Sequence, residues 1–297
     1  MIRLDFMIEL KYEIVNQPSD FIFNVHAAKT PCQTVIAENF QISQPVAISL
    51  LTDTVSGNRQ ARLQASLGTL IVRYAATVEI NHHIAPPNTV KETPISQLPT
   101  EVLPYIYPSR YCQSDRMQQI AHTEFGHLPT GYSRVLAIQN WVRKRTKFVS
   151  GSSNAMTSAI DTLSGQAGVC RDFAHLMIVL CRALNMPARF ATSIDYGSDP
   201  TFGPTDFHAY VEVYLGERWY LFDPTGMVLP MGLIRIGTGR DAADVSFAMI
   251  FGDVRSMPPI ITISSVENIA NNTVRPYTCN DALSTDMCHF QPIYGLI

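Results

Sequence analysis

The first third of the chain alternates between hydrophobic and polar residues in short runs. Between residues 7 and 15, Glu9, Lys11 and Glu13 occupy every second position, the period of a strand with one buried face. The strand candidates of this region are Phe6–Val15, Phe21–Val25, Phe40–Ile42, Val46–Thr52, Ala61–Leu67 and Leu70–Ile80. Leu67-Gly68-Thr69 separates the last two and predicts a tight hairpin. Short strands at a spacing of roughly ten residues favour an antiparallel β-sandwich.

The pattern changes after a passage that is rich in proline. Residues 86–108 contain Pro86, Pro87, Pro94, Pro99, Pro104 and Pro108. Because proline lacks a backbone donor and breaks helices, this passage predicts an ordered linker or crossing segment. Helical spacing of apolar residues follows, with candidates at Ser114–Thr123, a helix capped by Ser133, Asn154–Leu163 and Val169–Leu184.

Strands return in the last part of the chain, at Ala188–Tyr196, His208–Tyr214 and Trp219–Asp223. We therefore predict an α+β protein in three parts. Residues 1–107 form an antiparallel β-sandwich domain and residues 108–256 form a core of helices and strands. Residues 257–297 form a strand and loop extension that packs on the core or on the N-terminal domain.

Composition excludes several classes of protein. The chain has 297 residues, of which 46% are hydrophobic and 16% charged, so it can build packed cores and does not resemble a disordered protein. The net charge is −3, and the densest basic stretch is Arg143-Lys144-Arg145 with Lys147. We interpret that stretch as the solvated end of a helix, because a nucleic-acid binder normally presents a broad basic face.

The sequence predicts neither a membrane segment nor a metal site. No apolar stretch approaches the ~18 residues that a transmembrane helix needs, and the first five residues carry charges of both signs. We therefore expect a soluble, cytoplasmic protein. The six cysteines are scattered without a CxxC pair, which argues against a disulfide framework and a zinc site. We expect no cofactor.

Cys170 is the first candidate for chemistry. It follows a glycine-containing loop and begins an apolar helical run. A thiol at a helix N-terminus lies near free backbone N–H groups and the positive end of the helix dipole, and both favour the nucleophilic thiolate. Taken alone, Cys170 fits a buried structural cysteine as well.

Two downstream strands supply partners for this thiol. The residues from Asp206 to Tyr214 alternate, and Leu215-Gly216 predicts a two-residue turn before the returning strand. In that register His208 lies directly opposite Asp223, with Cβ atoms ~5 Å apart. The carboxylate then fixes the imidazole, whose other nitrogen faces the thiol, as in a nucleophile–base–carboxylate triad. Separately, His208 reads as a core histidine and Asp223 as the start of a turn.

The motifs around these residues resemble the bacterial transglutaminase-like superfamily, whose members are often described as cysteine proteases. The matching segments are Gly168–Leu176, Asp206–Val213, Trp219–Thr225 and Gly239–Val245. The resemblance covers about residues 130 to 255. The β-rich N-terminal region is similar to the domain that commonly precedes this core.

The resemblance implies the roles of the residues and the fold of the core. Cys170 would be the nucleophile, His208 the general base and acid, and Asp223 the residue that orients the imidazole. The core would be papain-like, with the cysteine helix packed against an antiparallel sheet. This chemistry requires no metal ion.

Other residues are weaker candidates. The backbone N–H of Cys170 would donate to the oxyanion, and Gln166 or Trp141 would supply a second donor. Substrate-cleft candidates are Tyr196, Phe207 and Trp219. Trp219 fits equally well as an anchor of the hairpin.

Three functions remain open. The first is a cysteine peptidase or amidase acting on a peptide or protein amide. The second is a true transglutaminase or an acyltransferase that uses a bound amine. The third is a non-catalytic scaffold that binds peptides or a partner. The sequence does not indicate the oligomeric state or the substrate.

Overall fold

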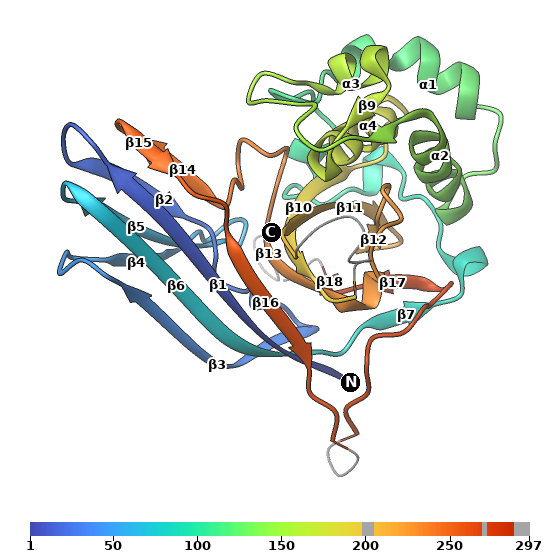
Figure 1. Cartoon of the computed structure of the whole chain (residues 1–297). Coiled ribbons are helices and arrows are strands. Elements are labelled where there is room, and N and C mark those ends of the chain that lie inside the picture. The colour runs from blue at the N-terminus through green and yellow to red at the C-terminus, as the bar shows by residue number, and fades with distance from the viewer. Residues whose placement is uncertain (198–204, 269–271, 288–297) are drawn as a thin grey trace, which may run out of the picture.

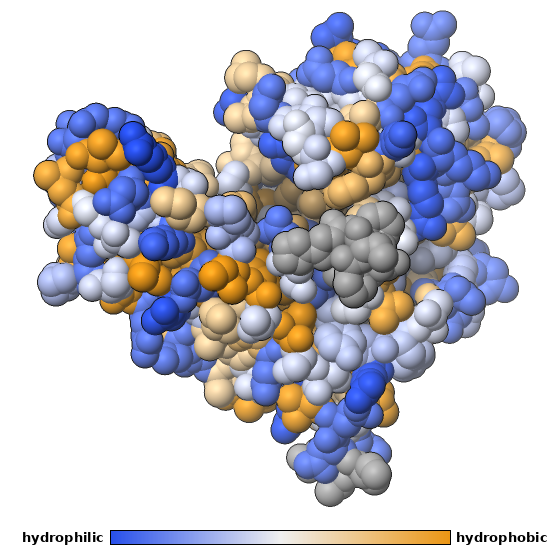
Figure 2. Space-filling view, viewed as in Figure 1, coloured by the Kyte–Doolittle hydropathy of each residue, from blue (hydrophilic) through white to orange (hydrophobic). Residues whose placement is uncertain are grey.

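The chain folds into two lobes of different construction (Figure 1). The computed structural model describes residues 1–197, 205–268 and 272–287. One lobe consists of two antiparallel sheets, and the other packs helices on a separate antiparallel sheet. The predicted α+β class is therefore confirmed. In the same view, Figure 2 shows a recess between the two lobes.

The N-terminal lobe is an antiparallel β-sandwich, as predicted. One sheet has the order β15-β1-β6-β3 with β16 also paired to β1, and the other has the order β14-β2-β5-β4. The N-terminal strands are β1 (Ile2–Ile14), β2 (Ser19–Phe23), β3 (Gln33–Ile42), β4 (Ser49–Thr52), β5 (Arg59–Ala65) and β6 (Gly68–Ile80). Every second residue of β1 and β6 is buried, so the alternation read from the sequence faces the space between the sheets.

The predicted hairpin at Leu67-Gly68-Thr69 is wrong. β5 pairs with β2 and β4, whereas β6 pairs with β1 and β3, so the chain crosses here from one sheet to the other. Both strands bury alternate side chains in the same core, and this pattern does not distinguish a hairpin from a crossing between sheets.

Three later strands complete the sandwich. These are β14 (Ala248–Phe251), β15 (Val254–Ser256) and β16 (Ile260–Ser265). β14 pairs with β2, while β15 and β16 pair with successive parts of β1. The predicted division at residue 256 thus falls between strands of one sheet.

The proline-rich passage runs between the lobes as short turns. β7 (His83–Ala85) directly precedes it, and it contains three 3₁₀ turns, η1 (Pro87–Thr89), η2 (Ile95–Gln97) and η3 (Leu103–Tyr105). β7 pairs with β17 (Ala282–Ser284), so part of the C-terminal extension lies against the strand that leads into this passage.

The second lobe is built around one central helix. Its other helical elements are η4 (Ser114–Arg116), α1 (Gln118–Phe125), α2 (Tyr132–Arg145) and α3 (Ala159–Gly165). The central helix is α4 (Cys170–Ala183), in which every side chain from Asp172 to Ala183 is buried. The short strands β8 (Lys147–Phe148) and β9 (Ala167–Gly168) pair just before it. The helix we expected to be capped by Ser133 begins at Tyr132, with Gly131 as its N-cap.

The sheet beneath α4 has the order β13-β10-β11-β12-β18. Its strands are β10 (Ala188–Asp195), β11 (Phe207–Leu215), β12 (Arg218–Phe222), β13 (Leu233–Gly239) and β18 (Asp286–Met287), and η6 (Pro230–Gly232) precedes β13. α4 packs on β10 and β11, which confirms the expected cysteine helix on an antiparallel sheet. Within the described ranges, no helix combines the length and apolar character needed to cross a bilayer.

Candidate functional site

The structure places Cys170 at the first position of α4. The residue before it, Val169, is extended, and its N–H donates to Asp172 Oδ2 at 2.8 Å. Asp172 is fully buried, and a Cβ added to Gly168 would lie 2.6 Å from its Cβ. Glycine at 168 therefore allows the loop to approach the helix closely, and the thiol projects from a fixed N-terminus.

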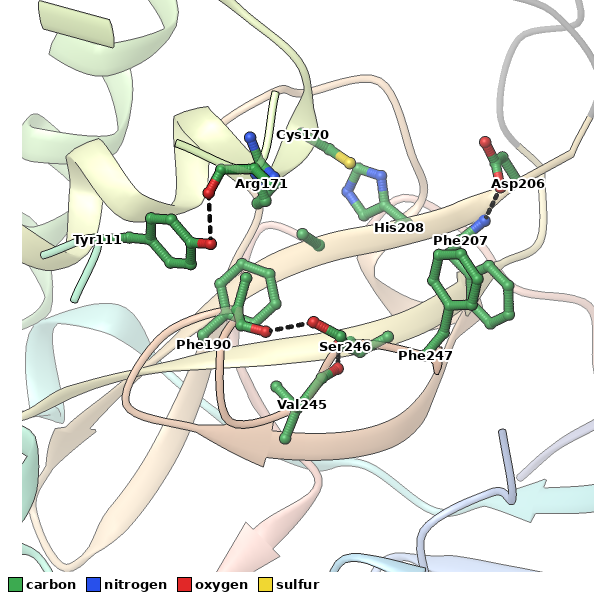
Figure 3. Close-up of a pocket in the computed structure, with 14 residues that line it drawn as sticks. Tyr111, Cys170, Arg171, Phe190, Asp206, Phe207, His208, Val245, Ser246 and Phe247 are labelled. Atoms are coloured by element: carbon green, nitrogen blue, oxygen red, sulfur yellow. Dashed lines mark hydrogen bonds between the residues drawn. The ribbon is translucent and has the colours of Figure 1, made fainter. Parts of the chain in front are cut away.

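His208 and Asp223 meet as the sequence predicts. His208 Nε2 lies 3.1 Å from Asp223 Oδ1, and both side chains are buried. The Cys170 sulfur points to the His208 ring (Figure 3). Thr225 donates to Asp223 Oδ1 from its backbone N–H at 3.1 Å and from its hydroxyl at 2.8 Å. The three predicted residues are therefore adjacent, and the carboxylate is held from two sides.

The register that brings them together differs from the predicted one. Leu215 pairs with Arg218, so the turn residues are Gly216 and Glu217, with φ values of 50° and 70°. A two-residue turn with positive φ at both positions matches the twist of the strands. This shifts the pairing by two residues, which keeps His208 and Asp223 on one face. They lie diagonally and not directly opposite, still within reach of each other.

The pKa values of this pair point to a charged imidazole. Burial lowers the pKa of His208, but the charge and hydrogen bond of Asp223, together with Cys170, raise it well above its usual value. Burial raises the pKa of Asp223, and the charge and hydrogen bond of His208, with the bonds from Thr225, lower it below its usual value. The pair is therefore suited to hold an imidazolium beside the thiol.

A pocket of about 300 Å³ opens beside the thiol, and we call it the thiol pocket. It is lined by Tyr111, Ala155, Cys170, Arg171, Phe190, Thr192, Asp206, Phe207, His208, Ala209, Ala242, Val245, Ser246 and Phe247. Figure 3 shows the aromatic rings of Phe207 and Phe247 to one side of His208, with Tyr111 and Phe190 toward α4. A molecule in this pocket would be in reach of both the thiol and the imidazole.

Phe207 is the predicted cleft residue that the structure brings to the thiol pocket. Tyr196 packs with the core of the sandwich instead. Trp219 is buried against Tyr214, which fits the alternative role of anchoring the hairpin, and the Arg189 guanidinium lies 4.1 Å from its ring centroid.

Neither candidate for a second oxyanion donor lines the thiol pocket. Gln166 is exposed in the left-handed conformation at the end of α3. The indole N–H of Trp141 donates to Glu124 at 3.1 Å. The backbone N–H of Cys170 remains the proposed donor.

Sequence reasoning missed two charged neighbours. Asp195 Oδ2 lies 3.9 Å from His208 Nδ1, on the side of the ring that faces the thiol. Arg143 Nη2 lies 3.4 Å from the carbonyl oxygen of Asp223, so part of the basic stretch on α2 supports the turn that carries the carboxylate. Asp195 ends a strand that is buried throughout, and Arg143 lies far away in sequence, so neither gave a local signal.

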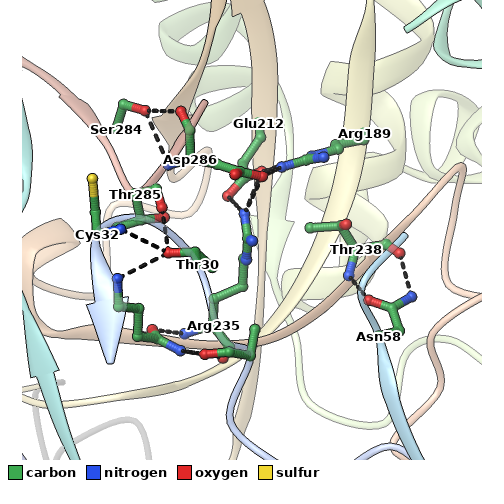
Figure 4. A network of polar contacts seen from close by, with 12 residues as sticks. Thr30, Cys32, Asn58, Arg189, Glu212, Arg235, Thr238, Ser284, Thr285 and Asp286 are labelled. Atoms are coloured by element: carbon green, nitrogen blue, oxygen red, sulfur yellow. Dashed lines mark hydrogen bonds and ion pairs between the residues drawn. The ribbon is translucent and has the colours of Figure 1, made fainter. Parts of the chain in front are cut away.

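A second polar cluster lies on the sheet of the second lobe, near Thr30 and Asn58 of the N-terminal lobe (Figure 4). Arg189 donates to Glu212 at 2.7 Å, and Arg235 donates to Asp286 at 2.9 Å, with Arg189 also bridging to Asp286. This cluster borders a pocket of about 380 Å³ that includes Trp219, and we call it the arginine pocket. The five cysteines of the described segments are free, and no three His, Cys, Asp or Glu side chains there are arranged to hold a metal ion.

Known proteins match both lobes. Residues 118–224 match the core of the transglutaminase-like superfamily, and residues 3–101 match the bacterial transglutaminase N-terminal domain. The crystal structure of a "Putative Cysteine Protease" from Cytophaga hutchinsonii is 37% identical in sequence and has a TM-score of 0.88. That similarity covers 95% of this chain and 97% of the Cytophaga chain.

A shorter match is found to the uncharacterized protein ML0607 of Mycobacterium leprae. It is 32% identical over 117 residues, which are 38% of this chain and 42% of that protein, so the match spans less than half of it. The family and the fold implied by the four matching segments are thus confirmed. The chain belongs to the transglutaminase-like superfamily and carries the bacterial transglutaminase N-terminal domain ahead of its core.

Proposed function

We propose that this protein is a cysteine hydrolase that cleaves amide bonds in peptides or proteins, with Cys170 as nucleophile, His208 as base and acid, and Asp223 as the residue that orients the imidazole. One observation carries the proposal. A thiol at the start of α4 faces a histidine whose other nitrogen is 3.1 Å from a buried carboxylate. This is the arrangement of an activated nucleophile with its base and its orienting group.

Acylation is the first half of the reaction. The Cys170 thiolate attacks the amide carbon, so that a C–S bond forms and the oxygen becomes an oxyanion near the N-terminus of α4. The His208 imidazolium then gives its proton to the amide nitrogen. The C–N bond breaks, the amine leaves, and a thioester remains on Cys170.

Deacylation restores the enzyme. Neutral His208 takes a proton from a water molecule, whose oxygen attacks the thioester carbon. The C–O bond forms, the C–S bond breaks, and the product leaves as a carboxylic acid. Cys170 returns as a thiolate beside the imidazolium, which Asp223 holds in orientation throughout.

A peptide library tests this proposal. Mass spectrometry would detect new carboxyl groups and released amines after incubation with the purified protein. We expect turnover that Cys170→Ala and His208→Ala abolish. Cys32→Ala serves as a matched control, because Cys32 is another free, partly buried cysteine but lies in the sandwich lobe. Turnover that survives Cys170→Ala would refute the proposal.

Transfer to an amine is the second candidate, because the N-terminal lobe matches a domain named for bacterial transglutaminases. A glutamine peptide supplied with a labelled primary amine separates the two reactions. Incorporated label indicates transfer, and ammonia release without incorporation indicates hydrolysis. If neither occurs and Cys170 is alkylated as an ordinary thiol whether or not His208 is present, the non-catalytic scaffold is the better description.

A further inference from the structure

We infer that the thiol pocket selects an aromatic or branched aliphatic side chain next to the amide that Cys170 attacks. This inference rests on the proposed function and adds the class of substrate. Three observations support it: the hydroxyl groups of the pocket wall are already hydrogen-bonded, the wall is held in place by contacts within the protein, and the charges at its edge do not attract an acidic side chain.

The polar side chains of the wall offer little to a polar ligand. The hydroxyl groups of Tyr111, Thr192 and Ser246 each donate to a backbone carbonyl of another lining residue, at 2.7, 2.8 and 2.8 Å. Because these donors already have acceptors, the wall presents mainly rings and methyl groups. A polar side chain placed there would lose hydrogen bonds to water without replacing them, whereas an apolar one would gain by leaving water.

The floor of the pocket is fixed in advance. The His175 ring lies between Tyr111 and Phe190, with centroid distances of 5.0 and 5.2 Å. His175 Nε2 accepts the backbone N–H of Ala242 at 3.1 Å, and Asp241 accepts the N–H of Tyr111 at 2.9 Å. These contacts tie the segment after β13 to α4, so a bound side chain would not have to order the wall itself.

One side of the pocket is aromatic and lies next to the reacting groups. Phe207 and Phe247 stack with a centroid distance of 4.4 Å, and both line the pocket together with His208. A ring or branched chain held there would lie beside the imidazole. At the edge, Arg171 is already paired with the buried Asp172 at 3.2 Å, so it offers little attraction to an acidic side chain, and the exposed Asp206 repels one.

Affinity labels test this selectivity without depending on turnover. The probes are acetyl-X chloromethyl ketones, in which X is Phe, Leu, Ala or Asp. The Cys170 sulfur displaces chloride, forming a C–S bond as the C–Cl bond breaks. Mass spectrometry gives the rate at Cys170, and each rate is divided by the rate with iodoacetamide, which reports the thiol alone.

We expect the Phe and Leu probes to label Cys170 about tenfold faster, or more, than the Ala and Asp probes. Ala155→Trp should reduce this ratio, because Ala155 lies on the exposed side of the pocket where a large ring fits without disturbing the core. Ala47→Trp is the matched control, an exposed loop alanine in the other lobe. Phe247→Ala should enlarge the pocket, so that an additional probe, acetyl-Trp chloromethyl ketone, labels Cys170 faster than the Phe probe.

Equal normalised rates for all four probes would overturn the inference, as would a ratio that Ala155→Trp and Ala47→Trp reduce alike. Either result leaves the proposed function standing if the peptides are still cleaved. Conversely, selective labelling without any cleavage would refute the proposed hydrolase while retaining the pocket's selectivity.

Discussion

The thiol pocket and the arginine pocket have similar volumes, about 300 and 380 Å³, but their charged groups are arranged differently. In the arginine pocket, Arg189 and Arg235 are both paired with Glu212 and Asp286. Burial lowers the pKa of Arg235, but the charges of Asp286 and Glu212 raise it, so the cluster is held fully ionised. Its charges are neutralised within the protein.

In the thiol pocket the hydroxyl groups of the wall are bonded within the protein, but the two reacting groups are only partly committed. His208 uses one ring nitrogen for Asp223 and turns the other side of its ring to Cys170. The groups that remain available are those that could react with a ligand. The comparison teaches that buried charge alone does not mark a functional site, because the ion pairs of the more highly charged pocket connect strands β10, β11, β13 and β18 to one another.

The same substitution in the two pockets gives the largest contrast. Asp223→Asn keeps the size of the side chain and an oxygen for Thr225 but removes the charge that stabilises the His208 imidazolium. We expect kcat to fall by about 10³- to 10⁴-fold, as when the carboxylate of a triad is neutralised. Turnover should be measured on protein whose circular dichroism is native. A fall of less than about tenfold would remove Asp223 from the mechanism.

Asp286→Asn should show the opposite behaviour. It leaves Arg189 and Arg235 buried with one carboxylate between them, and breaking a buried ion pair costs about 3 kcal/mol of unfolding free energy. We expect kcat per folded molecule to stay the same, because Asp286 does not line the thiol pocket. Urea unfolding measures the loss of unfolding free energy. A large loss of kcat with native stability would mean that the two pockets are coupled.

The two pockets should lose their contributions to stability at opposite ends of the pH range. The pKa of His208 is raised by Asp223 and Cys170 against the effect of burial, with Asp195 also facing the ring. Its stabilisation is therefore complete below about pH 6.5, the unfolded value, and is lost as the pH rises through the folded value. Burial raises the pKa of Asp286, but Arg235 and Arg189 lower it below its usual value. Its stabilisation is present above about pH 3.9 and is lost as the pH falls.

Urea unfolding from pH 3 to 9 would test both signs. The advantage of the native protein over His208→Gln should shrink toward high pH, and its advantage over Asp286→Asn should shrink toward low pH. An advantage over His208→Gln that grows with pH would mean that the imidazole is buried neutral.

Much of the fold could be predicted because its signals are local. Alternation in β1 and β6, the helical run after Cys170 and the motifs around it each lie within a short stretch of sequence. The pairing of β14, β15 and β16 with the sandwich could not be predicted, since these strands pair with strands more than 200 residues away in the sequence. The crossing after β5 was wrongly predicted as a hairpin, because alternation indicates which face of a strand is buried and not which strand lies next to it.

For the candidate site, the three reacting and orienting residues could be predicted from the sequence, but most of the pocket walls could not. Cys170, His208 and Asp223 were found from a helix start and a hairpin, and a register error of two residues did no harm because strand faces repeat with a period of two. The walls of the thiol pocket come from separate parts of the chain, including Tyr111, Phe190 and Phe247. No local pattern connects them, so sequence reasoning found Phe207 and missed the aromatic residue stacked on it.

Substitution of Trp219 has the smallest predicted effect, and it tests whether this residue belongs to the arginine pocket or to the thiol pocket. Its ring lies under Arg189 and packs edge-on to Tyr105 and Tyr214, at 5.2 and 5.3 Å, so it belongs to the arginine pocket. Trp219→Phe keeps an aromatic ring but weakens the contact with the guanidinium, which should cost about 1 kcal/mol of unfolding free energy. KM should not change.

Phe207→Leu is the matched substitution in the thiol pocket, where the stack on Phe247 is lost beside His208. We expect it to raise KM for substrates with an apolar side chain while leaving kcat closer to native. Steady-state kinetics and urea unfolding on both variants make the comparison. If Trp219→Phe raised KM and Phe207→Leu did not, the aromatic residue that contacts substrate would lie on the hairpin, and the division between a reactive pocket and a structural one would fail.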